Sequence, residues 1–330
     1  MQATIASISR GAKALLLLAG LAVNLEGGPA WAAPSGSPWG ASYFPNVELI
    51  TQDGQKVRFY DDLIKGKVFA INFIYTHCVY ACPLETAALR KVQQALGDRM
   101  GKDVHFYTIS IDAERDKPEV LKAYADKFHT GPGWTFLSGS KADVTLIRQK
   151  LGMYRDDGKQ EKDLSEHNIN VLMGSETGGQ WIKRSPFEEP AALARILGVR
   201  LQGGRGHAVP PMAIAMHDHH DDTPGQSLFR DKCEVCHSED STESIGPPLA
   251  GVTQRRDRTW LKQWIKEPDR MIARKDPTAL ALYRQYREIP MSNLKLNDRE
   301  VESILQYLEA SDRRAQVPVT AAAEPPTAAR

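Results

Sequence analysis

The stretch VFAINFIYTHCVYACP, residues 68–83, decides the fold of the first half of this 330-residue chain. Its first eight residues form a nearly continuous apolar and β-branched run, which is typical of a strand buried on both faces. Pro83 is expected to open a helix, because proline suits the first helical turn and apolar residues follow it at helical spacing. The stretch therefore predicts a strand followed by a helix, with Cys78 and Cys82 at their junction.

The same alternation of strands and helices continues over roughly residues 44–201. Asp116 and Glu119 are expected to cap the helix that follows the next buried strand. Strands alternating with helices predict an α/β sandwich around a largely parallel sheet. The other elements expected here are strands at residues 104–111, 134–137, 168–173 and 180–183, and helices at residues 143–151 and from Pro190.

The second half is expected to be a small all-helical domain at residues 225–313, joined to the first domain, residues 39–201, by a Gly- and Pro-containing linker at 202–224. In its last helix, Asn297 and Glu300 are placed to cap. The buried stripe of that helix is predicted to be Val301, Ile304, Leu305 and Leu308. The Ala- and Pro-rich tail, residues 314–330, is expected to be disordered.

The N-terminus and the composition bear on location and partners. Arg10 and Lys13 precede the apolar run 14–23, and small residues stand at Ala30 and Ala32, so residues 1–32 have the layout of a secretory signal peptide. A membrane anchor, the alternative, needs about 18 apolar residues. We therefore expect a periplasmic protein. A net charge of +1 and the lack of a phosphate-cradling glycine loop argue against a nucleic-acid partner.

The stretch CEVCH joins Cys233, Cys236 and His237 in a C-x-x-C-H motif. In this motif the thiols add to the two vinyl groups of a haem, and the imidazole becomes the proximal iron ligand. A structural disulfide with a chance histidine is the alternative interpretation. A distal ligand is expected from a later loop, where Met291 follows Pro290 and precedes the last helix.

Residues 225–312 resemble a class I cytochrome c in this motif, in GPPLAGV (residues 246–252) and in the final amphipathic helix. The resemblance implies that Met291 is the distal ligand of a haem c, with Met271 as its rival. A methionine packed in the core is the alternative. His/Met ligation raises the haem potential and suits electron transfer.

Cys78 and Cys82 stand four residues apart, one more than in C-x-x-C. If their turn is helical, both sulfurs lie on one face and the helix N-terminus lowers the pKa of both thiols. Two thiolates suit Cu(I) and leave room for a third ligand. The same spacing also supports a redox-active disulfide without metal.

Residues 39–197 resemble the Sco/SenC copper-protein family in C-x-x-x-C-P after a strand, in SIDAERDKPEVL and in a late histidine. The resemblance implies a thioredoxin-like fold, with Cys78, Cys82 and His167 as copper ligands and Asp112 beside them. Two positions depart from the family pattern. Asn168 stands where a small residue is usual, and His77 is a competing imidazole.

The linker adds thioether and imidazole donors, which suit copper in either oxidation state, although a plain hydrophilic hinge is the alternative. These donors are Met212, Met216, His217, His219 and His220.

Together, the resemblances imply a copper metallochaperone that carries a haem c and serves the copper subunit of cytochrome c oxidase or another respiratory redox protein. Such a protein would make peripheral contact with membrane complexes. One alternative is a thiol-disulfide oxidoreductase in which Cys78 and Cys82 are catalytic and the haem supplies electrons. Another is a simple electron carrier whose first domain only docks the partner.

Overall fold

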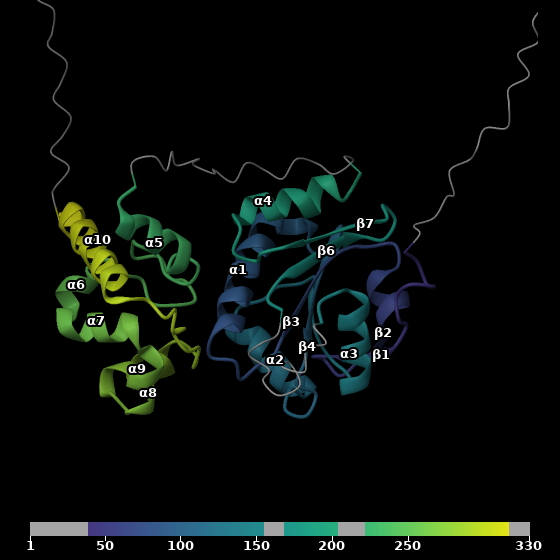
Figure 1. Ribbon diagram of the computed structural model, residues 1–330, viewed down its shortest axis with the longest axis horizontal. Helices are drawn as coiled ribbons and strands as arrows, with labels where there is room; N and C mark the ends of the chain where they lie inside the picture. The colour runs from purple at the N-terminus through teal and green to yellow at the C-terminus, as the bar shows by residue number, and fades with distance from the viewer. Residues whose placement is uncertain (1–38, 155–167, 204–221, 317–330) are drawn as a thin grey trace, which may run out of the picture. The chain divides into compact units, whose positions relative to one another are not determined.

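A computed structural model describes residues 39–154, 168–203 and 222–316. The first two ranges form an α/β domain, and the third forms a helical domain (Figure 1). The predicted signal peptide, nearly all of the linker, His167 and most of the tail lie outside the described residues. Within the three described ranges, no helix is long and apolar enough to cross a membrane.

The α/β domain is built on one seven-stranded sheet in the order β2-β1-β5-β4-β3-β6-β7. Its strands are β1 (Glu48–Thr51), β2 (Lys56–Arg58), β3 (Val68–Ile74), β4 (Val104–Ser110), β5 (Trp134–Ser138), β6 (Val171–Ser175) and β7 (Gln180–Arg184). Strands β3, β4 and β5 pair in parallel, and all the other pairings are antiparallel. The expectation of a largely parallel sheet is therefore wrong outside the centre. Short hairpins join β1 to β2 and β6 to β7, and a short hairpin can only pair strands antiparallel.

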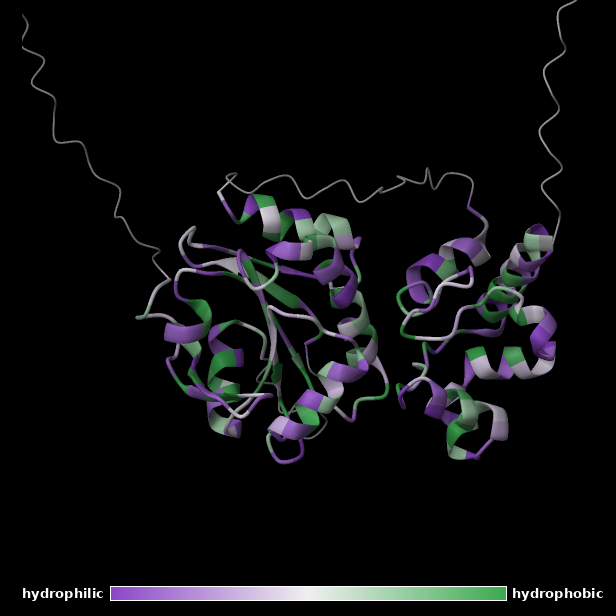
Figure 2. Ribbon diagram, turned by 180° about the vertical axis from the view of Figure 1, so that it is seen from behind, coloured by the Kyte–Doolittle hydropathy of each residue, from purple (hydrophilic) through white to green (hydrophobic). Residues whose placement is uncertain are grey.

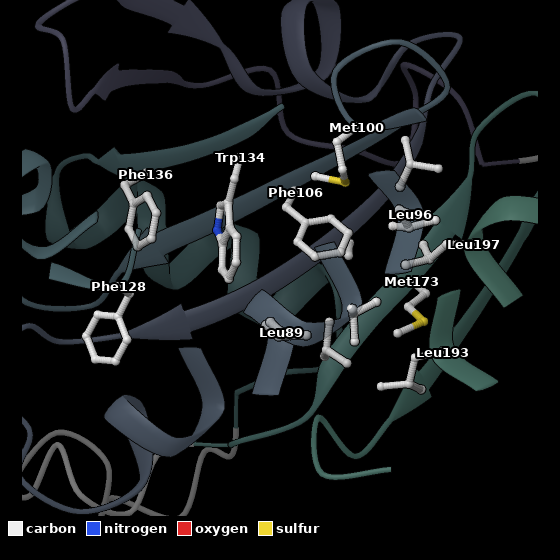
Figure 3. Close-up of a cluster of buried hydrophobic side chains, with 14 of the residues drawn as sticks. Leu89, Leu96, Met100, Phe106, Phe128, Trp134, Phe136, Met173, Leu193 and Leu197 are labelled. Atoms are coloured by element: carbon white, nitrogen blue, oxygen red, sulfur yellow. The ribbon is translucent and has the colours of Figure 1, made fainter. Parts of the chain in front are cut away.

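Helices cover both faces of the sheet, which makes the domain the thioredoxin-like α/β sandwich that was predicted (Figure 1). They are α1 (Ala81–Leu96), α2 (Pro118–Lys127), α3 (Lys141–Lys150) and α4 (Pro190–Arg195), with π-helical turns η1 (Phe59–Ile64) and η4 (Ile196–Arg200) and a 3-10 turn η2 (Gly97–Arg99). Side chains of α1, α2 and α4 share one core with the sheet (Figure 3). Those of η1 and α3 share the other.

Strand β3 lies at the centre of this sandwich, and all seven of its residues are buried. Ala70 and Ile74 point into the core under α1, whereas Phe69, Ile71 and Phe73 point into the opposite core. Alternate side chains of β3 thus enter two different hydrophobic cores, which explains why the strand is one continuous apolar run.

The helical domain comprises α5 (Pro224–Lys232), α6 (Val252–Arg255), α7 (Arg258–Lys266), α8 (Pro268–Ala273), α9 (Pro277–Gln285) and α10 (Asp298–Gln316). The predicted stripe of α10 is confirmed, since its four residues are each at most 5 % exposed. The predicted cap is also confirmed, because Asn297 Oδ1 accepts from the Glu300 backbone N–H and Glu300 Oε2 accepts from that of Asn297. Hydrophobic and hydrophilic residues alternate along these helices (Figure 2).

Helix α5 crosses α10 at Gly225, where the two backbones approach each other closely. A Cβ at this position would lie 2.0 Å from the Ser303 carbonyl oxygen, so only glycine fits. This crossing fixes the first turn of α5, and the C-x-x-C-H motif begins at Cys233, directly after the other end of the helix.

Candidate functional site

Cys78 and Cys82 lie where the chain passes from β3 into α1. Cys78 is in a turn closed by its own backbone N–H, which donates to the Tyr75 carbonyl at 3.2 Å. Cys82 is the second residue of α1, which begins at Ala81, two residues earlier than predicted. The side chains are 5 % and 0 % exposed, and all four cysteines of the chain are free thiols.

The two thiols share one proton unequally. The Cys82 thiol donates to Cys78 and, with the backbone N–H groups of Cys82 and Tyr80, lowers the pKa of Cys78 to about 5 against the opposing effect of burial. The same hydrogen bond, together with burial, raises the pKa of Cys82. The expectation that the helix N-terminus lowers both pKa values is therefore wrong for Cys82, because Cys78 lies outside the helix and takes the thiolate form.

Glu85 is a buried carboxyl one helical turn beyond Cys82. Neither of its oxygens has a hydrogen-bond partner among the described residues. Burial raises the pKa of Glu85 well above the ordinary glutamate value. This residue was not predicted from the sequence, although a glutamate in line with the apolar positions Leu89 and Val92 was the available signal.

Asp116 does not cap α2, contrary to the prediction. The N-cap residue is Lys117, and no side chain makes the cap hydrogen bond. The Asp116 carboxylate is fully buried and accepts hydrogen bonds from Thr76 and Ser110 instead. It therefore links the turn before Cys78 to the end of β4.

Asp112 lies beside His77, the imidazole next to Cys78. Its Oδ2 is 3.7 Å from His77 Nδ1. Arg115 Nη1 lies 2.9 Å from His77 Nε2, and since arginine only donates, this nitrogen accepts. His77 is thus held in a surface network with Asp112 and Arg115.

The predicted third copper ligand, His167, lies outside the described residues. Among the residues that the structure does describe, no group of three or more His, Cys, Asp or Glu side chains is arranged to hold a metal ion. The chain becomes described again at Asn168 and enters β6 at Val171. Because β6 runs antiparallel to β3, it enters at the edge of the sheet where β3 ends and the cysteine turn begins.

The C-x-x-C-H motif forms the second site. An apolar cavity in the helical domain is lined by Cys233, Cys236, His237 and Met291. His237 Nδ1 lies 2.8 Å from the Pro247 carbonyl oxygen, which can only accept, so Nδ1 carries the proton and Nε2 is left to bind a metal.

The surroundings of His237 fit a haem iron ligand. Gly246 lies against the ring, where a Cβ would come within 2.6 Å of His237 Cε1. Burial lowers the pKa of His237, which keeps the imidazole neutral, and raises the pKa of Cys233 and of Cys236 to about 12. The donor set therefore suits haem c.

Of the two methionines, only Met291 lies at this cavity among the described lining residues. Met271 is 2 % exposed within α8 and is not part of the lining. The cavity lining thus includes Met291, the predicted distal residue, and does not include its rival Met271.

Comparison with known families agrees with both halves of this description. The SCO1/SenC family model matches residues 40–197, and the cytochrome c family model matches residues 223–312. The chain contains a SCO1/SenC domain followed by a cytochrome c domain.

Relatives of the SCO1/SenC domain are moderately similar. The SCO1 protein homolog of Bacillus subtilis is 36 % identical over 89 residues, which cover 27 % of this chain and 45 % of that protein. A structure of Bradyrhizobium japonicum ScoI with copper bound is 26 % identical, with TM-score 0.37, and covers 46 % of this chain and 94 % of that one. A structure that identified a disulfide switch in BsSco, a member of the Sco family of cytochrome c oxidase assembly proteins, is 23 % identical, with TM-score 0.39, and covers 46 % of this chain and 88 % of that one. The chain spans about half the length of the curated relatives it matches first.

Proposed function

We propose that this protein binds copper through Cys78, Cys82 and His167 and delivers it to the copper subunit of a respiratory cytochrome c oxidase. Its cytochrome c domain carries a haem c for electron transfer. The basic and apolar N-terminal segment supports export, so the protein works in the periplasm. The observation that carries the proposal is the buried Cys78–Cys82 pair, which shares a single proton at the junction of β3 and α1.

The donor chemistry of this pair supports copper as the cargo. Cys78 is ionised at neutral pH, and thiolates are the ligands that Cu(I) prefers. When Cu(I) binds at pH 7, Cys78 has no proton to lose and Cys82 releases one, so the pair becomes a dithiolate at the cost of a single deprotonation. The SCO1/SenC domain match supports the same metal.

The sheet register supports an imidazole as the third ligand. His167 directly precedes Asn168, and the segment from Asn168 leads into β6 at the edge where Cys78 lies. An imidazole added to two thiolates gives three donors, which hold copper in both oxidation states.

In the cytochrome c domain, Cys233 and Cys236 would attach haem c through thioether bonds, and His237 and Met291 would bind its iron. Bound haem supplies reversible one-electron transfer at a raised potential. The chain's own contribution is to hold His237 through Pro247, so that Nε2 faces the cavity, and to keep water from the site with apolar side chains.

A second candidate function is thiol-disulfide exchange, and the unequal proton sharing favours it specifically. The Cys78 thiolate would attack a partner disulfide and release one partner thiolate, which takes the Cys82 proton. Cys82 would then attack the Cys78 sulfur, forming an internal disulfide and releasing the second partner thiolate. Two electrons pass to the partner, and a dithiol reductant or two one-electron transfers through the haem must restore the pair.

The copper stoichiometry distinguishes copper delivery from thiol-disulfide exchange. The exported chain is purified with its haem attached, reduced and titrated with Cu(I), and the His167→Ala variant is treated identically. We expect one tightly bound copper in the wild type, much weaker binding in the variant and the same haem spectrum in both. Binding that ignores His167, or no tight copper at all, would favour the exchange function instead.

A further inference from the structure

Asp116 belongs to the loop that follows β4, and its side chain contacts the loop that follows β3. The two strands are parallel and in register, with Ile74 opposite Ser110, so both loops start at the same edge of the sheet. The Asp116 side chain is 0 % exposed, which is unusual for a carboxylate unless hydrogen-bond donors surround it.

Three donors satisfy this carboxylate. Oδ2 accepts from the Thr76 backbone N–H at 3.0 Å and from the Ser110 hydroxyl at 2.5 Å. Oδ1 accepts from the Thr76 hydroxyl at 2.5 Å. Two of the three bonds therefore go to Thr76, which is 40 residues away in sequence and two residues before Cys78.

The loop that carries Asp116 is itself anchored. The Asp116 backbone N–H donates to the Asp112 carbonyl at 2.9 Å, and the Asp112 backbone N–H donates to Ser110 Oγ at 3.0 Å. Asp116 thus presents its carboxylate from a closed loop, and Thr76 is the residue that it holds.

The segment that Asp116 restrains includes Tyr75, which contacts Cys78 directly. Tyr75 contributes a side-chain hydrogen bond to Cys78 and accepts the backbone bond that closes the turn. Thr76 lies directly between Tyr75 and His77 in this turn. Because Thr76 is only two residues from Cys78, a backbone that moves at Thr76 also displaces Cys78.

We propose that Asp116 is a positioning residue, which clamps Thr76 so that Cys78 is held in hydrogen-bond reach of Cys82 and in place to bind copper. This inference rests on the proposed copper function for its consequence, although the clamp itself also acts in the copper-free protein. Groups that orient metal ligands in this way are worth about 10- to 100-fold in metal affinity.

The test uses the full haem-loaded chain and two clamp variants. Asp116→Asn keeps the shape of the side chain but removes one acceptor oxygen, and Thr76→Val keeps the shape of Thr76 but removes its hydroxyl. Thr76→Ser retains both bonds and serves as the conservative variant. Glu176→Gln is the matched control, because Glu176 also accepts a backbone N–H and a hydroxyl, from Gly66 and Tyr60, at the opposite end of the same sheet.

Two readouts are taken on each protein. The first is Cu(I) affinity by competition with a chromophoric chelator. The second is the pH dependence of Cys78 alkylation in the copper-free protein, followed by mass spectrometry. If Asp116 positions Cys78, the Cu(I) affinity of both Asp116→Asn and Thr76→Val should fall by about 10- to 100-fold. Their alkylation profiles should also move toward higher pH, with Thr76→Ser and Glu176→Gln unchanged.

The alkylation readout separates positioning from a simple charge effect. Removing a negative charge near Cys78 without moving the turn would shift its profile to lower pH, the opposite direction. A shift to lower pH, an unchanged profile, or an equal loss in Glu176→Gln would overturn the inference. If the wild type binds no copper, the proposed function fails, yet the alkylation profiles still decide whether Asp116 positions Cys78. If Asp116→Asn does not fold, Thr76→Val carries the test.

Discussion

The two cysteine pairs of this chain contain the same side chains in opposite chemical states. At the first pair, a hydrogen bond from Cys82 lowers the pKa of Cys78 to about 5, so one thiolate is present at neutral pH. At the second pair, burial raises the pKa of Cys233 and Cys236 to about 12, so both remain thiols. The first pair suits an exchangeable metal, whereas the second suits permanent attachment of a cofactor.

The difference comes from what the backbone offers each pair. One extra residue places Cys78 in a turn before α1, where the Cys82 thiol and the N–H groups of Tyr80 and Cys82 converge on its sulfur. Cys233 follows the end of α5, and its thiol meets burial without a comparable set of donors. Spacing thus selects the hydrogen bonds, and the hydrogen bonds select the protonation state.

Exchanging a sulfur for an oxygen in each pair should separate the two sites most sharply. Cys78→Ser removes a copper ligand, and we expect a loss of Cu(I) affinity beyond the roughly 100-fold that groups merely orienting a ligand contribute. Its haem absorption should stay that of the wild type. Cys236→Ser should show the reverse pattern, with a single-thioether haem spectrum and unchanged copper binding. Wild-type copper affinity in Cys78→Ser would break the comparison.

Proton release on copper binding sharpens the comparison further. Since Cys78 is ionised above about pH 5 and Cys82 is not, Cu(I) binding at pH 7 should release about one proton. The affinity should then rise about tenfold per pH unit near neutrality and more steeply at lower pH, where Cu(I) must also displace protons from Cys78 and from the His167 imidazole. Titration in weakly buffered solution with a pH indicator measures this directly. Two protons released at pH 7 would show that Cys78 titrates like an ordinary thiol.

Glu85 should make the stability of the SCO1/SenC domain depend on pH. The folded chain keeps the Glu85 proton at pH values where the unfolded chain, with an ordinary pKa of 4.5, has released it. Rising pH therefore favours unfolding, by up to about 1.4 kcal/mol per pH unit between 4.5 and the raised pKa. Glu85→Gln should remove this slope.

Hydrogen exchange of the α1 amides at several pH values, corrected for intrinsic rates, measures the slope within this domain. Glu114→Gln is the control, because Glu114 is exposed and its replacement should leave the slope as it is. A slope that survives in Glu85→Gln would assign it to another group.

The elements predicted from the sequence were those with long and regular hydrophobic patterns. Strand β3 was recognisable because it feeds two cores, and α10 because it has one apolar stripe and a capping box. Strands β1 and β2 were missed, since strands of four and three residues give too little pattern. The antiparallel pairing of β6 was missed although the strand itself was predicted, because a hydrophobic pattern does not give the direction in which a strand pairs.

The spacing of the cysteines located the candidate sites, but it did not predict the protonation states of their thiols. The two cysteine motifs are visible in the sequence, whereas the shared proton depends on Cys78 lying in the turn before α1 rather than within the helix. Asp116 resembled a helix cap because Glu119 follows it three residues later, and only the folded loops reveal that Thr76 and Ser110 are its partners. His167 remains a prediction.

The smallest expected effect concerns the helix that closes the cytochrome c domain. Asn297 Oδ1 accepts from the backbone N–H groups of Arg299 and Glu300 at 3.0 and 3.1 Å. Asn297→Ala leaves both donors without this acceptor and should cost about 1 kcal/mol of stability. Asn297→Asp retains an acceptor and should cost much less.

Thermal unfolding followed at the haem absorption measures this loss, and Cu(I) affinity is determined on the same samples. The haem transition of Asn297→Ala should fall below that of both the wild type and Asn297→Asp, while copper binding stays constant, because the cap lies in the helical domain and the copper ligands do not. A parallel fall in Cu(I) affinity would mean that the first pair depends on the fold that holds the second, and the two sites would then have to be treated as one coupled unit.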